Sequence, residues 1–265
     1  MGKLGRLTAF AAEAALWVTG AALVAGAAGA HWNVDPAAAL NDILAQPSES
    51  PSISAGPTLA PGASATASPV ALKYMAYVAR PDFQFRAKST EAISVTSAGK
   101  TVVMDMDGTL SYRAGNVIDS HRETVAGAVT TEDYVYVGDQ QYESKNGAAW
   151  VKSPRPATEK ASDKMLFAPT SRFVEAGVET KNGLQLHRLQ VADATAFDKA
   201  IVKATDGATD ADMTLTVWVG DDGAPAAIRL EGWIVATVNG VAAKETTDSE
   251  LRIVTTSGVT IAAPI

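Results

Sequence analysis

Two carboxylates only two positions apart, Asp105 and Asp107, are the side chains of this 265-residue chain whose spacing is best suited to chemistry. They follow the apolar run Thr101–Met104 and lead into Gly108. A pair of acids at the end of a strand can serve as acid and base or bind a divalent cation. Whether this pair forms such a site depends on the elements that position it.

The segment Asp105–Leu110 resembles the first motif of haloacid dehalogenase-type phosphatases. In that family the acid matching Asp105 is the nucleophile and the acid matching Asp107 is the general acid, at the end of a parallel strand near Mg²⁺. A helix-rich domain should follow, but Val117–Trp150 is typical of consecutive strands and hairpins. The acids of Gly220–Asp222, a possible downstream motif, fall in another hairpin turn. We therefore interpret the pair as the last acids of a strand at a glycine turn and keep the phosphatase as a third hypothesis.

Other reactive side chains are scarce. The chain has no cysteine, which excludes disulfides, thiolate metal sites, cysteine catalysis and a lipidated cysteine. His31, His121 and His187 lack neighbours at metal-ligand spacing. We expect them to be surface or hydrogen-bonded structural residues, and we expect no metal site, no cofactor and no catalytic residue. A net charge of −7 and a pI near 5.0 argue against a nucleic-acid partner.

The clearest local signal for structure is the stretch Asp133–Lys152, which predicts three strands joined by two tight turns. Aromatic and β-branched residues fill the strands, while Gly138-Asp139 and Asn146-Gly147 fill the corners. Asn-Gly between two such runs is the strongest short-range hairpin signal, because both residues tolerate positive φ. The third strand is expected to carry Trp150.

The rest of the C-terminal part alternates short strands with few helices. Helical spacing is predicted at Ala71–Arg80, at Ala194–Ala204 and, as a short turn, at Asp163–Phe167. Strands are predicted around Phe83–Phe85, Val102–Met106, Val117–Val129, Leu184–Val191, Met213–Val219, Ala226–Val238, Ser249–Thr256 and Val259–Ile261. Short turns between neighbouring strands indicate an α+β fold, an antiparallel sheet with one apolar face covered by the helices.

The N-terminus is predicted to be an export segment. Lys3 and Arg6 precede Ala14–Ala30, which is 17 residues without a charge. Ala28-Gly29-Ala30 fits a signal-peptide cleavage site, while the length is close to the lower limit for a membrane anchor. A buried alanine-rich helix is the remaining alternative. We therefore predict that residues 1–30 are a signal peptide or a transmembrane anchor, which would place the rest of the chain outside the cytoplasm.

Three further units follow along the chain. Residues 31–47 are expected to form a short helical segment, with Asp35 as N-cap before Pro36. Residues 48–69 are almost wholly Ser, Pro, Ala, Gly and Thr, a composition that predicts a disordered tether. Residues 70–265 are expected to form the folded domain.

Three separated motifs of the folded domain resemble the LppX/LprG-type envelope lipoproteins, whose fold is similar to that of the carriers LolA and LolB. The motifs are Tyr142 with Asn146-Gly147 and Trp150–Lys152, the turn Asp221-Asp222-Gly223-x-Pro225, and the terminal Val259–Ile261 with Pro264. The resemblance covers about residues 70–265. It implies a strongly curved antiparallel sheet, an incomplete barrel, closed by helices around an apolar cavity for acyl chains. Members of the family are usually anchored by a lipidated cysteine, so here the N-terminal segment would anchor the protein, or the protein is released.

These observations predict a non-catalytic, exported and envelope-tethered protein that binds a lipid or a lipidated protein, with an envelope protein as a further possible partner. The alternative is an exported scaffold or protein-interaction module with a packed core. The cavity candidates are apolar residues of the predicted inner face and of a mobile rim: Phe83, Phe85, Met104, Met106, Met165, Leu166, Phe167, Leu215, Val217, Ile228 and Leu230.

Overall fold

The structure, a computed structural model, describes residues 68–97, 99–125, 127–155, 172–181, 183–205, 207–238 and 241–265. The predictions for residues 1–30, 31–47 and most of 48–69 lie outside this part of the chain, as does the helical turn at Asp163–Phe167. They remain predictions. Within the described residues, no helix is long and apolar enough to cross a membrane.

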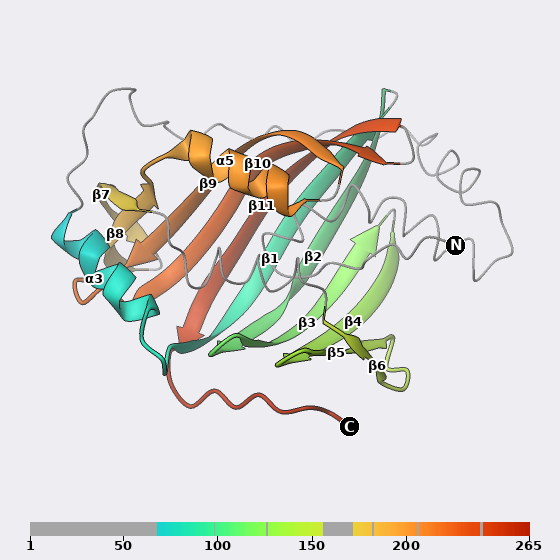
Figure 1. Ribbon diagram of the computed structural model, residues 1–265, viewed down its shortest axis with the longest axis horizontal. Helices are drawn as coiled ribbons and strands as arrows, with labels where there is room; N and C mark the ends of the chain where they lie inside the picture. The colour runs from blue at the N-terminus through green and yellow to red at the C-terminus, as the bar shows by residue number, and fades with distance from the viewer. Residues whose placement is uncertain are drawn as a thin grey trace, which may run out of the picture.

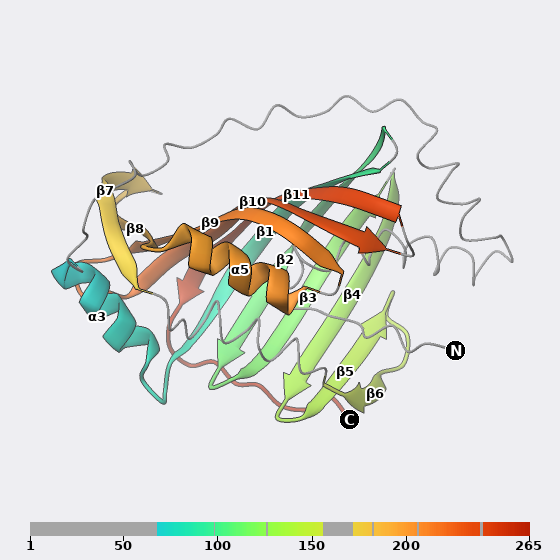
Figure 2. The same cartoon turned by 45° about the horizontal axis from the view of Figure 1, so that its top comes forward.

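The described strands form one 11-stranded sheet in the order β6-β5-β4-β3-β2-β1-β11-β10-β9-β8-β7, with every strand pair antiparallel. The sheet is strongly curved, and its outer strands β6 and β7 do not pair with each other (Figures 1 and 2). This confirms the predicted fold class, an incomplete antiparallel barrel. The bounds are β1 Gln84–Ser97, β2 Lys100–Arg113, β3 Asn116–Val125, β4 Ala128–Val137, β5 Gln140–Lys145, β6 Val151–Pro154, β7 Phe173–Lys181, β8 Leu184–Val191, β9 Ala208–Val219, β10 Pro225–Val238 and β11 Val241–Thr255.

Neighbouring strands in the sheet are also neighbours along the chain, with one exception. β1 pairs with β11 through 12 register partners, from Arg86 with Thr255 to Ser97 with Ala243. This pairing joins an N-terminal half, β1–β6, to a C-terminal half, β7–β11. Along β1, burial alternates with a period of two, so Phe85, Ala87, Ile93 and Val95 face inward.

Two helices lie on the concave side of the sheet (Figures 1 and 2). α3 spans Pro69–Val78, and the Ser68 side chain caps it by accepting a hydrogen bond of 3.1 Å from the Ala71 N–H. α5 spans Ala194–Ala204, as predicted, with Asp193 as its N-cap. α5 packs on β9, where its Phe197 and Ile201 are buried, and α3 packs against β7.

The turn between β9 and β10 contacts α3 and holds it in place. Lys73 Nζ donates to the Asp221 carbonyl oxygen over 2.7 Å, and the Tyr74 ring meets Phe173 of β7 edge-on at 5.2 Å. A Cβ on Gly223 would lie 2.6 Å from the Tyr74 backbone nitrogen, and the residue has φ +83°. Only glycine lets this turn approach the helix so closely.

Several sequence predictions differ from the observed elements. The predicted strand Val117–Val129 is two strands, because β3 ends at Val125 and β4 begins at Ala128. Val259–Ile261 is not a strand: Val259 is buried, and its backbone bonds to the side chains of Gln84 and Arg113 instead of a ladder. Trp150 lies just before β6, which begins at Val151. β7 was not predicted. The first half of β11 was not predicted either, because residues 241–248 are mostly polar and small.

Candidate functional site

The concave face of the sheet brings together the described cavity candidates. Phe83, just before β1, and Phe85 of β1 are buried on this face. Met104 and Met106 of β2 are buried beside them. Further along the sheet, the buried candidates are Leu215 and Val217 of β9 and Ile228 and Leu230 of β10. The two methionines belong to a smaller cluster with Ile93 and Val95, and the other six belong to the main core. Met165, Leu166 and Phe167 lie outside the described residues. That these side chains contact a lipid remains a prediction.

The helices occupy only one part of this face. α5 contacts β9, and α3 contacts β7 (Figure 2). Neither described helix lies over the concave side of β3–β5 (Figures 1 and 2), where the Arg155 guanidinium lies 4.7 Å from the centre of the Tyr136 ring. Of the described helices, α5 thus covers the part of the face at β9.

An aromatic series continues the apolar surface from β1 toward β4. Phe85 stacks on Tyr112 of β2 at 5.6 Å, and Tyr134 stacks on Tyr136 of β4 at 6.2 Å. Both tyrosines of β4 are buried, and Tyr136 lies opposite Val117 of β3. Rings spaced in this way present flat, adaptable apolar surface across several strands.

A buried polar network interrupts the apolar lining on β3–β5. Glu132 accepts hydrogen bonds from Tyr134 Oη and Lys145 Nζ. Burial alone would raise the pKa of Glu132, but these two hydrogen bonds outweigh it, and the pKa lies below its ordinary value. Beside it, His121 Nδ1 lies 3.1 Å from Asp119 Oδ2, and the His121 ring stacks on Tyr134. His121 is therefore a hydrogen-bonded structural histidine, as predicted.

Acids that were not predicted from the sequence also lie on this inner face. Glu91, Glu123 and Glu245 are buried, with exposed fractions of 6%, 5% and 1%. The alternation of inward and outward side chains along a strand could have predicted that they are buried. Glu91 shares the alternation phase of Phe85 and Ile93, which placed it inward with the apolar residues.

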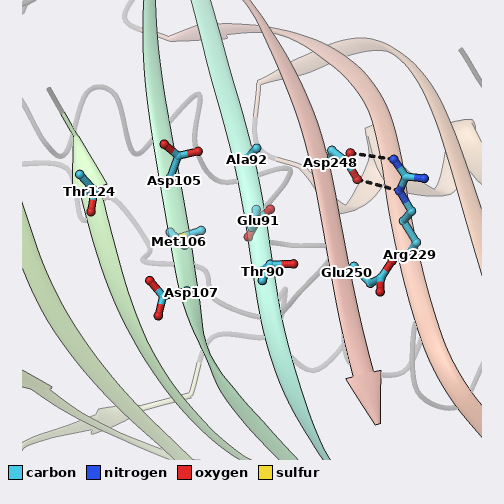
Figure 3. A pocket seen from close by; sticks show the side chains of 10 residues that line it. All are labelled: Thr90, Glu91, Ala92, Asp105, Met106, Asp107, Thr124, Arg229, Asp248 and Glu250. Carbon is cyan, nitrogen blue, oxygen red and sulfur yellow. Dashed lines mark hydrogen bonds and ion pairs between the residues drawn. The ribbon is translucent and has the colours of Figure 1, made fainter. Parts of the chain in front are cut away.

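Asp105 and Asp107 lie on the opposite, convex face. Figure 3 shows them beside Thr90, Arg229, Asp248 and Glu250 around an open depression of about 620 Å³. Both acids are exposed in the middle of antiparallel β2, not at the end of a parallel strand. The interpretation that they are the last acids of a strand at a glycine turn is also wrong, because β2 continues through Gly108 to Arg113. The arrangement that the phosphatase hypothesis requires is therefore not the one observed.

The other charges around this depression are already paired. Arg229 donates to both carboxylate oxygens of Asp248, over 2.8 and 2.7 Å, and Lys181 pairs with Glu250 at 2.8 Å. Within the described part of the chain, no group of three His, Cys, Asp or Glu side chains could hold a metal ion. The face has the character of a solvated, ion-paired surface.

His187 of β8 connects its own strand to β7 and to the turn between β9 and β10. Its Nδ1 lies 2.6 Å from Glu175 Oε1 of β7, and its Nε2 lies 2.9 Å from Asp221 Oδ1 in the β9–β10 turn. The same turn holds Lys73 of α3. Hydrogen bonds to Glu175 and Asp221 raise the pKa of His187. A protonated His187 donates to both acids and so ties β8 to its neighbours.

This geometry predicts that His187→Gln changes the pH dependence of stability. Because the pKa of His187 is higher in the folded state, its contribution is fully present below its unfolded pKa of about 6.5. The contribution is lost as the pH rises through the folded pKa. At pH 6, we expect the free energy of unfolding of the wild type to exceed that of the variant by roughly 1 kcal/mol or less, because Asp221 is exposed. At pH 9, the two free energies of unfolding should be equal. Urea unfolding at both pH values measures this, and parallel pH curves would contradict it.

Comparison with known proteins gives structural matches only. No family model and no curated protein sequence matches the chain. Among solved structures, LppX from Mycobacterium tuberculosis matches with a TM-score of 0.38 and 10% identity, over 72% of this chain and 96% of that one. LprF from Mycobacterium bovis matches with a TM-score of 0.36 and 15% identity, over 75% and 98%.

LppX is thus among the proteins that this chain resembles, as its sequence motifs predicted. A LolA superfamily protein from Nitrosomonas europaea also matches, with a TM-score of 0.22 and 8% identity over 69% of this chain and 92% of that one.

Proposed function

We propose that this protein is an exported, envelope-tethered carrier that holds the acyl chains of a lipid or a lipidated protein against the concave face of its sheet. The observation that carries the proposal is the apolar lining of that face. It extends from the aromatic rings of β4 to the aliphatic side chains of β9, while the described helices pack mainly against β7 and β9. This continuous apolar lining has the chemistry that suits a long apolar ligand.

Burial supplies the binding energy in this mechanism. Each CH₂ group moved out of water stabilises the complex by about 0.8 kcal/mol. Met104 and Met106 lie in the smaller cluster, and unbranched methionine side chains adapt to irregular apolar ligands. No cofactor and no chemical step is required.

The N-terminal sequence supports the location. The export segment at residues 1–30 and the tether at residues 48–69 would hold the domain near the outer side of a membrane. If the export segment is cleaved, the protein is secreted. Either product works outside the cytoplasm, with a membrane lipid, a lipidated protein or an envelope protein as partner.

One observation favours the alternative, a packed interaction module. The eight described cavity candidates are at most 6% exposed. Side chains buried to this degree can be core that supports a binding surface elsewhere. The two functions differ in one property, because a carrier takes up an apolar ligand of several hundred Å³ and a packed module does not.

We expect the full-length protein, purified from a membrane-containing host, to carry about one lipid per chain in native mass spectrometry followed by organic extraction. Leu215→Trp should abolish the bound lipid, because a larger ring would fill the concave face at β9, where Leu215 is buried. Leu184→Trp is the matched control, since Leu184 is 59% exposed on β8. Circular dichroism and thermal unfolding should show that both variants are folded.

A clean apo mass, together with no uptake of a fluorescent acyl probe, would contradict the carrier and favour the interaction module. Equal loss of lipid in both tryptophan variants would show that the lipid is not held on the concave face. The extracted lipid would also identify the ligand class.

A further inference from the structure

A row of register partners crosses the concave face and changes from polar to apolar along its length. Its members are Glu123 of β3, Met106 of β2, Glu91 of β1, Ser249 of β11, Leu230 of β10 and Leu215 of β9. We call these six residues the transverse row. Because neighbouring strands are about 4.8 Å apart, the three steps from Glu123 to Ser249 span roughly 14 Å.

Two polar side chains of the transverse row are buried without a hydrogen bond to any described residue. Ser249 is 0% exposed, and its Oγ has no partner. Glu123 is 5% exposed and lies among the charges of Glu132, Lys145 and His121 without bonding to them. Burial, and then the neighbouring Glu132, raise the pKa of Glu123. A buried polar group without a partner costs free energy, which a ligand group bonded to it would recover.

The polar half of the row is acidic. Glu91 lies between Glu123 and Ser249 and accepts a hydrogen bond of 3.0 Å from Thr247 Oγ1. The cations beside Glu123 are already paired within the network, Lys145 with Glu132 and His121 with Asp119.

A phosphate or carboxylate placed here would add an anion next to buried acids. Like charges repel strongly where the surroundings are poorly polarisable. A ligand hydroxyl carries no such penalty, because it can donate to a carboxylate and can also bond to the Ser249 hydroxyl.

We propose that the transverse row binds the uncharged, hydroxyl-bearing end of an acyl lipid at Glu123, Glu91 and Ser249, with the acyl chain continuing over Leu230 and Leu215. The inference rests on the proposed function and narrows its ligand class to neutral acyl lipids. Both leucines are buried, and β9 is the strand on which α5 packs, so the chain end of the ligand lies on the helix-covered side. Fatty acids and phosphate-bearing lipids are disfavoured.

The test compares two probes with the same acyl chain on the full-length protein, monolauroylglycerol and lauroyl lysophosphatidic acid. Isothermal titration should show at least roughly tenfold tighter binding of the neutral probe, a difference of about 1.4 kcal/mol. Equal affinity, or preference for the anionic probe, would overturn the inference and leave the carrier function standing. Binding of neither probe would remove the carrier function as well.

Substitutions that remove carboxylates then test whether the preference for the neutral probe comes from the transverse row. Glu91→Gln combined with Glu123→Gln should raise the affinity for lysophosphatidic acid about tenfold and reduce the preference. Asp105→Asn combined with Asp107→Asn removes the same charge from the exposed convex side of β2 and should leave the preference unchanged. Ser249→Ala should weaken monolauroylglycerol binding severalfold. If the convex pair changes the preference as much as the concave pair, the selectivity comes from net charge and not from the transverse row.

Discussion

Gly232→Ala is expected to lower the free energy of unfolding by about 3 kcal/mol or more, through two separate effects. Gly232 of β10 has φ +142°, a conformation that L side chains rarely adopt. A Cβ there would lie 2.9 Å from the Met213 Cα and closer still to the Asp212 carbonyl oxygen, both in the backbone of β9. Because backbone cannot move aside as a flexible side chain does, β9 and β10 would have to separate. Urea denaturation with circular dichroism measures the loss.

The same substitution at Gly177 separates the two effects. Gly177 of β7 has φ +135°, so alanine there meets nearly the same backbone strain, but its Cβ would meet nothing within 4 Å. We expect Gly177→Ala to cost only about 1–2 kcal/mol. Equal losses at the two positions would mean that the close approach of β9 to β10 contributes nothing to stability.

The elements that the sequence predicted best are those with local signals. β8 and α5 begin and end as predicted, since β8 is a short apolar-rich run and α5 an amphipathic run after the N-cap Asp193. Both turns of the β4–β6 hairpins were predicted from Gly138-Asp139 and Asn146-Gly147, and Gly138, Asn146 and Gly147 all have positive φ. Tight turns depend on the types of a few neighbouring residues, so they can be predicted without knowing the fold.

Long-range pairing could not be predicted in the same way. The β1–β11 pairing joins residues more than 140 positions apart, and no local pattern specifies it. The first half of β11, residues 241–248, contains Lys244, Glu245 and Asp248 and has the composition of a loop. It is a strand because β1 and β10 on either side supply its hydrogen bonds.

Only part of the candidate site could be predicted from the sequence, because the rest of it depends on long-range strand pairing. Period-two alternation placed Phe85, Met104 and Leu215 on one face, and the structure shows all three buried on the concave side. Glu123 and Ser249 were overlooked, because a polar residue in a strand is more often exposed than buried. Only the register of β3, β2, β1 and β11 brings them into one row.

Phe85→Ala is expected to lower the free energy of unfolding of the lipid-free protein by about 3–5 kcal/mol, the usual cost of truncating a packed phenylalanine. Phe85 is 0% exposed, its ring lies 5.8 Å from Phe83, and it stacks on Tyr112. The substitution would leave a void among rings that belong to the main core. Chemical denaturation after delipidation measures the effect.

Val178→Ala is the control, because Val178 is 56% exposed and its truncation should change stability by no more than about 0.5 kcal/mol. The size of the Phe85 effect also locates the ligand. A loss of about 3–5 kcal/mol means that the rings around Phe85 are structural core, which stabilises the fold whether or not a lipid is bound. A loss below about 1 kcal/mol would contradict the prediction. It would show that Phe85 borders a space that is unfilled without lipid, so that the acyl chain itself completes the packing at this end of the sheet.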